Sequence, residues 1–413
     1  MVTSKKPERT FVRLNTRGRA EESLNLTRMT IRSLPDASLP GGGCGAPVSF
    51  RERAGETCLS MAGLSSNEAS RAARLFETLG GGSWIPGPGE VTGRQTLFLA
   101  GTPSDFLALA SLLLESEGWK GHFADSILEL MRRSGSPRSL LLRNADLLEG
   151  RPYLIMGVIN VTPDSFSDGG RFLAPEDAVA QGMKLAEEGA DILDLGAESS
   201  RPGSEPVSVE EELKRLLPVL SSLRERLPDI PISVDTTKSA VAEKVLDAGA
   251  DMINDISAGT FDPEMLPLCA ERRVPVVLMH IRGTPKTMQE APRYDEVVSE
   301  VAAELYERVR AAEKAGLGPG FIITDPGIGF GKRPCDNTAL IAHIEALTAL
   351  GHPVLVGASR KSLIGALTGA PVEQRLPGSI ALHVTAFHNG ASILRVHDVA
   401  AHRQALECAV ACR

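Results

Sequence analysis

The sequence predicts a (β/α)8 barrel preceded by a small α/β domain. From residue 154 to the C-terminus, eight short apolar runs recur at similar intervals, and each ends in a polar residue suited to chemistry. The stretches between these runs have helical character. In a barrel of this kind the C-terminal ends of the strands converge on one pocket, so the polar residues are expected to meet there.

The apolar runs have the length and composition of buried strands. They are expected at 154–159, 192–195, 232–234, 252–253, 276–279, 321–324, 354–356 and 393–394. Helices are expected between them at 175–188, 208–226, 239–248, 295–315, 337–350 and 399–411. Residues 139–153 indicate a hairpin that would close the bottom of the barrel before its first strand.

The 413 residues suffice for a barrel plus one extension at ~100–200 residues per domain. Residues 1–47 are polar and then rich in proline and glycine, which favours a flexible segment. Residues 48–138 are expected to form a small α/β accessory domain, with a helix after Ser65 or Ser66, a strand at 95–100 and a helix over 106–117. The barrel is assigned to residues 139–413.

The composition narrows the function classes. A net charge of −8 gives no general attraction to nucleic acid or to an anionic membrane. The densest apolar run, 106–114, is shorter than the ~20 residues of a membrane span. The six cysteines include no CxxC pair, which favours free thiols in a reducing compartment. These features predict a cytoplasmic protein that acts on small molecules.

The segment 160–170, Asn-Val-Thr-Pro-Asp-Ser-Phe-Ser-Asp-Gly-Gly, is the densest polar loop of the chain. Glycine and proline alone would fit an ordinary surface loop. Asn160, however, stands at the tip of the first apolar run and offers a carbonyl oxygen to a hard cation. One neutral oxygen is a weak site, so Mg²⁺ would also need waters and a substrate phosphate.

Asp235, Asn254 and Asp325 each end a different apolar run. Any one of them alone would more readily be a rim ion pair or a helix cap, because an unpaired carboxylate is costly to bury. Three such residues at three strand tips instead favour a pocket for a flat heterocycle. A carboxylate can accept two parallel hydrogen bonds from adjacent N–H groups on the edge of such a ring. Arg201, in a loop beside Pro202 and Gly203, suits a phosphate or carboxylate partner.

Three further segments carry candidate ligand contacts. Residues 325–332 only superficially resemble a phosphate loop, because the glycine spacing is too short and Arg333 stands where Ser or Thr is needed. We therefore interpret them as a flexible loop in which Phe330 can cover a ring. Ser359 to Ser362 follows the seventh run, and Arg395 and His397 follow the eighth, where barrels often bind phosphate.

Together these segments resemble the dihydropteroate synthases of folate biosynthesis, over residues from about 140 to 413. The matching text comprises Met156 to Gly170, Ser199 to Gly203, Ser233 to Thr236, Ile253 to Ile256, Leu278 to His280, Asp325 to Gly327, Ser359 to Lys361 and Arg395 to Asp398. The family more usually has Thr where Ser200 stands, which keeps the hydroxyl and removes a methyl group. The segment before the barrel resembles an accessory segment of some longer members.

The resemblance implies a transferase that joins 6-hydroxymethyl-7,8-dihydropterin diphosphate to p-aminobenzoate and releases diphosphate, with Mg²⁺ as cofactor. It also implies a homodimer that binds neither nucleic acid nor membrane. By motif position, the resemblance implies that Mg²⁺ is bound by Asn160 together with the diphosphate, and that the diphosphate is also bound by Arg395 and His397. The pterin would be bound by Asp235, Asn254, Met279, Asp325 and Lys361. The p-aminobenzoate site would be shaped by Ser200, Arg201, Phe330 and Ser362, and the loops that close over it would carry Asp164, Phe166 and Arg201.

The same resemblance makes Asp235, Lys361, Arg395 and His397 the catalytic residues. Asp235 would stabilise the cation that develops at the pterin as the diphosphate departs. We expect no dedicated general base, because the aniline nitrogen of p-aminobenzoate already has a low pKa.

Two other functions use related text. A pterin-dependent methyltransferase shares Asp- and Asn-tipped strands, but the loops 164–170 and 359–361 disfavour it. A catalytically inactive pterin-binding protein would be expected to lose some of these residues, and none of the catalytic text is eroded. A third possibility is fusion to the kinase that precedes this enzyme in the pathway. Residues 1–150 contain no acidic metal-binding motif, which disfavours this possibility.

Overall fold

A computed structural model describes residues 27–28, 57–85, 95–115, 122–134, 138–161, 175–199 and 207–412. The chain divides into two compact units. The first unit comprises residues 1–137 together with two later segments, 293–307 and 342–351. The second unit comprises the remaining residues. The domain boundaries expected from the sequence stay a prediction.

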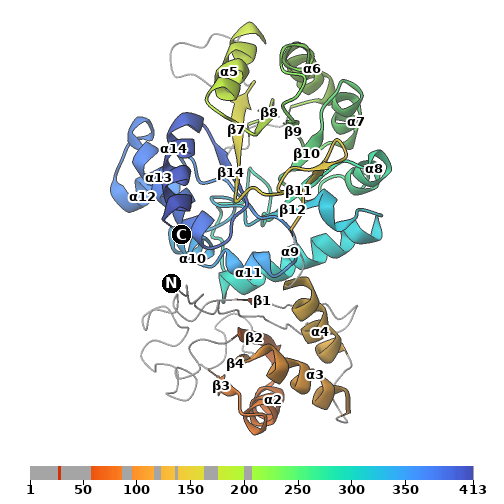
Figure 1. Cartoon of the computed structure of the whole chain (residues 1–413), viewed down its shortest axis with the longest axis vertical. Helices are drawn as coiled ribbons and strands as arrows, with labels where there is room; N and C mark the ends of the chain where they lie inside the picture. The colour runs from red at the N-terminus through yellow and green to blue at the C-terminus, as the bar shows by residue number, and fades with distance from the viewer. Residues whose placement is uncertain are drawn as a thin grey trace. The chain divides into compact units, whose positions relative to one another are not determined.

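The second unit contains a barrel of eight parallel strands with helices on its outside (Figure 1). The strands are β7 (Leu154–Asn160), β8 (Ile192–Gly196), β9 (Ile232–Asp235), β10 (Met252–Asp255), β11 (Val276–Met279), β12 (Ile322–Asp325), β13 (Leu355–Val356) and β14 (Ile393–Val396). Their order in the sheet is β12-β11-β10-β9-β8-β7-β14-β13. A parallel bridge between Thr324 and Val354 joins the two edges and closes the barrel. The predicted (β/α)8 fold is therefore confirmed.

All eight expected strands form, with ends within two residues of the predicted ones. The clearest difference is at Phe321, which ends a 3-10 turn (Pro319–Phe321) instead of starting β12. Apart from at most two polar positions in each, the strands are apolar, because both faces of a parallel barrel strand are covered, one by the barrel interior and one by helices. This explains why the runs read as continuous and not alternating.

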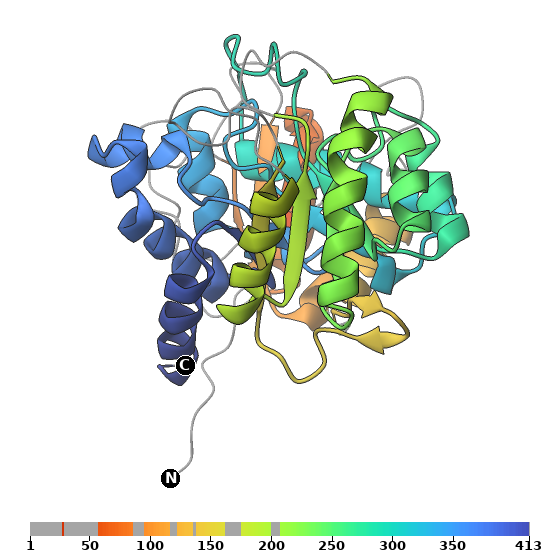
Figure 2. The same cartoon turned by 90° about the horizontal axis from the view of Figure 1, so that it is seen from above.

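Helices connect the strands in chain order. They are α5 (Pro175–Glu187), α6 (Val209–Arg226), α7 (Ser239–Asp247), α8 (Met265–Arg272), α9 (Val297–Lys314), α10 (Pro334–Ala342), α11 (Glu345–Thr348), α12 (Ser362–Thr368), α13 (Leu376–His388) and α14 (Val399–Ala411). Helices α5 and α6 lie side by side on the outside of the barrel (Figure 2). The six predicted helical segments form, although 337–350 splits into α10 and α11.

The sequence analysis missed α8, α12 and α13. Helix α13 starts with Leu376-Pro-Gly, which looks like a loop, but proline is tolerated in the first turn of a helix. Gly378 is needed there for packing, because a Cβ at this position would lie 2.4 Å from Cγ2 of Ile364 on α12. The two helix-breaking residues thus belong to a close helix–helix contact.

A short hairpin closes the N-terminal end of the barrel, as the sequence predicted. Its strands are β5 (Leu141–Leu142) and β6 (Ala145–Asp146), and the turn residues Arg143 and Asn144 both have positive φ, at 49° and 66°. Two such residues in a row fit the tight turn of a two-residue hairpin. Leu140 and Leu142 pack into one buried cluster with the lowest side chains of the barrel strands.

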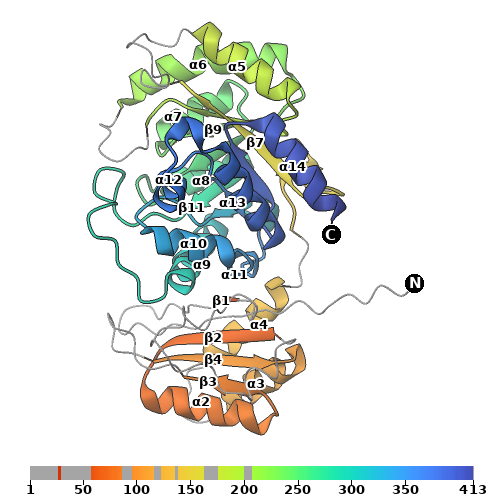
Figure 3. The same ribbon diagram turned by 90° about the vertical axis from the view of Figure 1, so that its left-hand side faces the viewer.

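The first unit contains an antiparallel sheet covered by helices. Its strands are β1 (Thr27–Arg28), β2 (Thr57–Leu64), β3 (Gly82–Trp84) and β4 (Gln95–Gly101), in the order β1-β2-β4-β3. Its helices before the barrel are α2 (Ser66–Thr78), α3 (Pro103–Glu115) and α4 (His122–Ser134). Figure 3 shows β2, β4 and β3 side by side with α2 against them.

Side-chain caps fix the starts of two of these helices, one of them after Ser65 as the sequence suggested. Ser65 and Glu68 form a reciprocal capping box at α2. Thr102 and Asp105 exchange a similar pair of hydrogen bonds at α3, of 2.8 and 3.2 Å. The rings of Phe76 and Phe106 stack at 4.8 Å between their centroids in the core beneath. Strands β2 and β3 and helix α4 were not predicted. No helix of the described residues is long and apolar enough to cross a membrane.

Candidate active site

The candidate site is a layer of polar side chains above an apolar floor inside the barrel. The floor comprises Leu154, Met156, Ile192, Met252, Val277, Ile323, Leu355 and Ile393, with Leu140 and Leu142 of the hairpin beneath. Side chains two residues apart in a strand point to the same face. The residues two positions beyond five of the floor residues are Asp194, Asn254, Met279, Asp325 and Arg395. Five strands therefore deliver these side chains to one level of the barrel interior.

Arg395 connects strands on both sides of the layer. Its Nε donates to Oδ2 of Asp194 at 2.7 Å, and its Nη2 donates to Oδ2 of Asp235 at 3.0 Å. Nδ2 of Asn254 donates to the same Asp194 oxygen at 3.2 Å. Asp194 is fully buried, and a buried carboxylate is tolerated only when it is paired. The guanidinium therefore holds β8, β9 and β14 in one arrangement.

Asp235 has a titration far from that of an ordinary carboxyl. The pKa of Asp235 is raised to about 7, chiefly by burial; the positive charge of Arg395 opposes this shift, and the negative charge of Asp194 contributes to it. The side chain keeps 20% of its surface exposed, so a ligand in the pocket can reach it. At neutral pH the group is thus poised between its charged and neutral forms, as is typical of functional sites.

Asp325 and Lys361 form the opposite side of the layer. Oδ1 of Asp325 accepts the N–H of Gly327 at 2.6 Å. Nζ of Lys361 donates to the carbonyl of Ile328 and lies 4.5 Å from the centre of the Phe330 ring. Burial lowers the pKa of Lys361 to about 8, although Asp325 opposes the shift. Burial also raises the pKa of Asp325, although Lys361 opposes the shift.

Lys332 anchors the loop that carries Phe330. Its side chain is almost fully buried. Its ammonium contacts Nδ1 of His280 at 2.9 Å and the carbonyls of Gly327 and Phe330 at 3.1 and 2.9 Å. Gly327 is confined to glycine, because its φ is +66° and a Cβ there would lie 2.0 Å from the carbonyl oxygen of His280. Lys332 thus stabilises the backbone of its own glycine-rich loop.

His397 is held by Ser359 from the preceding strand's loop. Oγ of Ser359 accepts the His397 N–H at 3.2 Å and lies 3.0 Å from its Nδ1. Burial, followed by the positive charge of Arg395, lowers the pKa of His397 to about 4. With Oγ–H donating to Nδ1, the neutral imidazole carries its proton on Nε2. Arg360 pairs with Asp398, with 3.0 Å between Nε and Oδ2, so Asp398 does not cap α14.

The predicted residues fall into two groups. Asp235, Asn254, Met279, Asp325 and Arg395 lie in the polar layer, and Lys361, Phe330 and His397 join it from the adjoining loops. Asn160 stands at the exposed tip of β7, in register with Gly196 and, through it, with Asp235. Ser362 is exposed at the start of α12. Asp164, Phe166, Ser200 and Arg201 lie outside the described residues.

The sequence analysis missed Asp194, the partner of Arg395. Its signal was present: a carboxylate stands inside the otherwise apolar run 192–195, two residues after a floor residue. A carboxylate inside an apolar run does not mark the end of a strand, so the strand-tip pattern does not single it out. Ser359 and Lys332 also act through contacts that their motifs do not reveal, because a single polar residue in a loop gives no signal of its partner.

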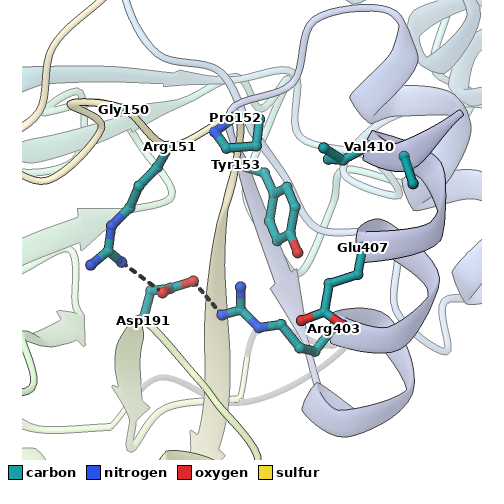
Figure 4. Close-up of a pocket in the computed structure, with 9 residues that line it drawn as sticks. Gly150, Arg151, Pro152, Tyr153, Asp191, Arg403, Glu407 and Val410 are labelled. Atoms are coloured by element: carbon teal, nitrogen blue, oxygen red, sulfur yellow. Dashed lines mark hydrogen bonds and ion pairs between the residues drawn. The ribbon is translucent and has the colours of Figure 1, made fainter. Parts of the chain in front are cut away.

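Two cavities lie outside the polar layer. One, of about 450 Å³, borders the tip of β7, α5 and the start of α14, and Asn160, Arg360 and His397 line part of it. The other, of about 420 Å³, lies at the N-terminal end of the barrel (Figure 4). There Asp191 forms ion pairs with Arg151 at 2.9 Å and with Arg403 at 2.7 Å, so these three charged groups stabilise one another. This end of a barrel generally serves stability.

Comparisons with known proteins agree on one family. The model of a family described as "Pterin binding enzyme" matches residues 156–397. A dihydropteroate synthase of Synechocystis sp. is 46% identical over 256 residues, which cover 62% of this chain and 88% of that protein.

Solved structures give the same result. A Xanthomonas albilineans dihydropteroate synthase with 4-aminobenzoic acid has 49% identity and a TM-score of 0.61, over 67% of this chain and 98% of that chain. A structure of the X. albilineans enzyme in complex with 7,8-dihydropteroate has 49% identity and a TM-score of 0.57, over 63% of this chain and 93% of that chain.

The raised pKa of Asp235 predicts a pH-dependent stability effect. Between pH 4 and about 7 the folded protein binds a proton at this carboxyl that the unfolded chain has released, so stability falls as pH rises. Asp235→Asn, which stays neutral, should therefore gain stability relative to the parent protein across this range and level off above pH 7. Urea unfolding at several pH values measures this difference. A constant difference between pH 4 and 8 would contradict the raised pKa, and Asp229→Asn, at an exposed aspartate just before β9, is the control.

Proposed function

The chain belongs to the dihydropteroate synthase family of pterin-binding enzymes, and we propose the following roles for its residues in the reaction. The resemblance expected from the sequence is confirmed. The activity is the condensation of 6-hydroxymethyl-7,8-dihydropterin diphosphate with p-aminobenzoate to 7,8-dihydropteroate, with release of diphosphate. In this reaction the bond between the pterin methylene and the diphosphate oxygen breaks, and the amine nitrogen forms the new bond and loses a proton.

The polar layer supports a pterin site. A pterin is flat, with N–H donors and ring acceptors along its edge, and the apolar floor gives one face of it a dry surface. Asn254 and Asp325 would pair with this edge, since the carboxylate of Asp325 has one oxygen beyond the one bonded to Gly327. Met279 lines the site, and Lys361 would donate to a ring acceptor. Phe330, whose ring lies under the Lys361 ammonium, would cover a ring of the ligand.

Asp235 would stabilise the transition state electrostatically. As the diphosphate leaves with the bonding electrons, positive charge develops on the pterin methylene and spreads into the ring. A nearby positive charge favours the ionised carboxyl, so the pKa of Asp235, raised by burial to about 7 in the free protein, would fall during the reaction. The carboxylate thus interacts most strongly with the transition state, which is the condition for catalysis.

Arg395 and His397 would bind the diphosphate. They stand two residues apart after the floor residue Ile393, at the end of the eighth barrel strand in chain order. Arg395 supplies the positive charge. Because burial lowers the pKa of His397 to about 4, this histidine is neutral in the free protein and would contribute a hydrogen bond from Nε2. A bound diphosphate would raise that pKa and favour proton uptake.

Mg²⁺ is the proposed cofactor, and the residues at the tip of β7 fit it. Asn160 Oδ1 and Asp235 Oδ2 lie 4.0 and 3.9 Å from the point that a Cβ of Gly196 would occupy, so the absent side chain leaves room between two hard oxygens. The described residues contain no cluster of three or more His, Cys, Asp or Glu that could hold a metal. Asn160 would therefore share the ion with waters and the diphosphate, and the bound ion would neutralise charge on the leaving group.

The p-aminobenzoate site would be completed by loops. Among the described residues, Phe330 and Ser362 would contribute to it. Ser200 and Arg201 are proposed to bind the aminobenzoate, and Asp164, Phe166 and Arg201 are proposed to act in closure over the site. No general base is assigned, since the aromatic amine already carries its lone pair at neutral pH.

We also propose a cytoplasmic homodimer. Leu367 and Val372, on and after α12, are 54% and 47% exposed, and a second copy would remove this apolar surface from water. The free thiols at Cys335, Cys408 and Cys412 are exposed and fit a reducing compartment. Sedimentation velocity tests the assembly, and a monomer at all micromolar concentrations would reject it.

A coupled assay of diphosphate release tests the activity. Release from the pterin diphosphate should require p-aminobenzoate and should match dihydropteroate formation one to one. Release at the same rate without the amine would indicate a hydrolase. An Asp235→Asn variant should retain pterin binding and lose about a hundredfold or more in kcat, the range for removing one preorganised electrostatic contact.

Loss of the diphosphate contacts should be selective for the leaving group. Arg395→Ala and His397→Ala should weaken binding of the pterin diphosphate by about thirtyfold or more, and binding of the bare pterin much less, because truncating one partner of a charged contact costs ~2–5 kcal/mol. Isothermal titration calorimetry with both ligands measures the two losses. Equal losses for both ligands would reject the assignment, and His388→Ala, at an exposed histidine on α13, is the control.

Asn160→Ala tests the magnesium contact. Without this oxygen the concentration of Mg²⁺ needed for half-maximal activity should rise about tenfold or more, the usual scale for loss of one supporting group at a metal site. Asn160→Asp, which offers a charged oxygen, should restore the dependence. An unchanged Mg²⁺ titration for the alanine variant would remove Asn160 from the site.

A further inference from the structure

We propose that His383 and His402 are positioning residues, which together lock the loop after β13 to the start of α14 and thereby place Lys361 and His397 for the reaction. The proposal deepens the function above and rests on the roles given there to Lys361 and His397. Neither histidine enters the reaction chemistry already described. His383 lies on α13 and His402 on α14, outside the polar layer.

The two histidines form one continuous hydrogen-bonded chain. The N–H of Ala358, in the loop after β13, donates to Nε2 of His383 at 2.9 Å. Nδ1 of His383 lies 2.9 Å from Nε2 of His402. Nδ1 of His402 lies 2.7 Å from the carbonyl oxygen of Asp398, the residue before α14. Both side chains are almost completely buried, at 0% and 1% exposed.

The two backbone ends fix every proton in this chain. The Ala358 N–H can only donate, so Nε2 of His383 must be unprotonated and its proton must sit on Nδ1. That proton is donated to Nε2 of His402, which leaves the second proton on Nδ1 of His402. The Asp398 carbonyl can only accept, which matches. An extra proton on either ring would place two donors face to face. Burial lowers the pKa of both histidines, which agrees with two neutral rings.

Both ends of the chain adjoin proposed site residues. Ala358 precedes Ser359, the partner of His397, and lies three residues before Lys361. Asp398 directly follows His397. The charged or titratable groups that face the pair are Lys361, His397 and Asp398, and none of their side chains hydrogen-bonds to either imidazole ring. The hydrogen-bonded histidine pair therefore sets the spacing between two backbone segments whose side chains would bind the pterin and the diphosphate.

The loop needs such support because its backbone is strained. Arg360 has φ of +57°, a conformation uncommon for a residue with a Cβ. Its N–H donates to Oγ of Ser379 at 2.9 Å, and its side chain pairs with Asp398. Ser379 and His383 stand four residues apart on one face of α13. One helix thus holds both Ala358 and Arg360, and the histidine chain carries the restraint on to α14.

Kinetics of the full-length enzyme can separate positioning from simple support of the fold. His383→Leu and His402→Leu should each raise the KM for pterin diphosphate about tenfold, because a displaced Lys361 and His397 bind it less well. A variant that is merely less stable has fewer active molecules, which lowers the apparent kcat and leaves KM unchanged. The double variant should match the worse single one, since either substitution breaks the same chain.

Conservative and control variants complete the design. His402→Gln keeps one acceptor and one donor and should return KM to within about threefold of the parent value. His388→Leu, at an exposed histidine on the same helix α13, should leave KM unchanged. Folded His383→Leu and His402→Leu enzymes with the parent KM would overturn the proposal.

Two further measurements keep the proposal separable from its premises. If Lys361→Ala also leaves KM unchanged, the proposed pterin site is wrong; if Lys361→Ala raises KM and the leucine variants do not, only the histidine chain is wrong. Should the leucine variants fail to fold, nitrogen-15 NMR of the histidine-labelled parent enzyme decides the matter. It should show both residues neutral with the proton on Nδ1, and an Nε2 proton on either ring would overturn the proposal.

Discussion

The site depends on one partly buried cation, Arg395, placed between the carboxylates of Asp194 and Asp235. Without it, two negative charges would share the low-dielectric interior of a barrel, which is strongly unfavourable. With it, both carboxylates are held at fixed positions and one of them, Asp235, keeps a pKa near neutrality. Arg395 is also the residue proposed to meet the diphosphate. When that anion arrives, it competes with Asp194 and Asp235 for the same guanidinium.

This competition couples leaving-group binding to the charge on Asp235. A guanidinium drawn toward the diphosphate screens Asp235 less, which by itself would raise the pKa of that carboxyl. A developing cation on the pterin acts in the opposite direction. In the ground state the cation is absent and only the first effect operates, whereas the second appears and grows as the bond breaks. The ionised form of Asp235 is therefore least stabilised before the reaction and most stabilised in the transition state.

Most of the fold was predictable because the barrel repeats one rule eight times. A short apolar run followed by a polar tip located every strand, and the hairpin beneath the barrel was legible in residues 139–153. Strand-tip residues such as Asn254 and Asp325 were found for the same reason. Asp194 was not, because it lies inside its run, and a carboxylate there makes sense only once Arg395, some two hundred residues later, is known to face it.

The histidine chain shows a different limit of sequence reasoning. His383 and His402 lie on helices whose sequences suggest only packing, and α13 itself was not predicted. Their meaning depends on an Ala358 N–H and an Asp398 carbonyl, and a sequence does not reveal where a backbone group points. The polar layer is encoded by side chains at regular spacing and can be read. The shell that holds it is encoded in backbone positions created by the fold, so residues that place a site are systematically harder to foresee than residues that line it.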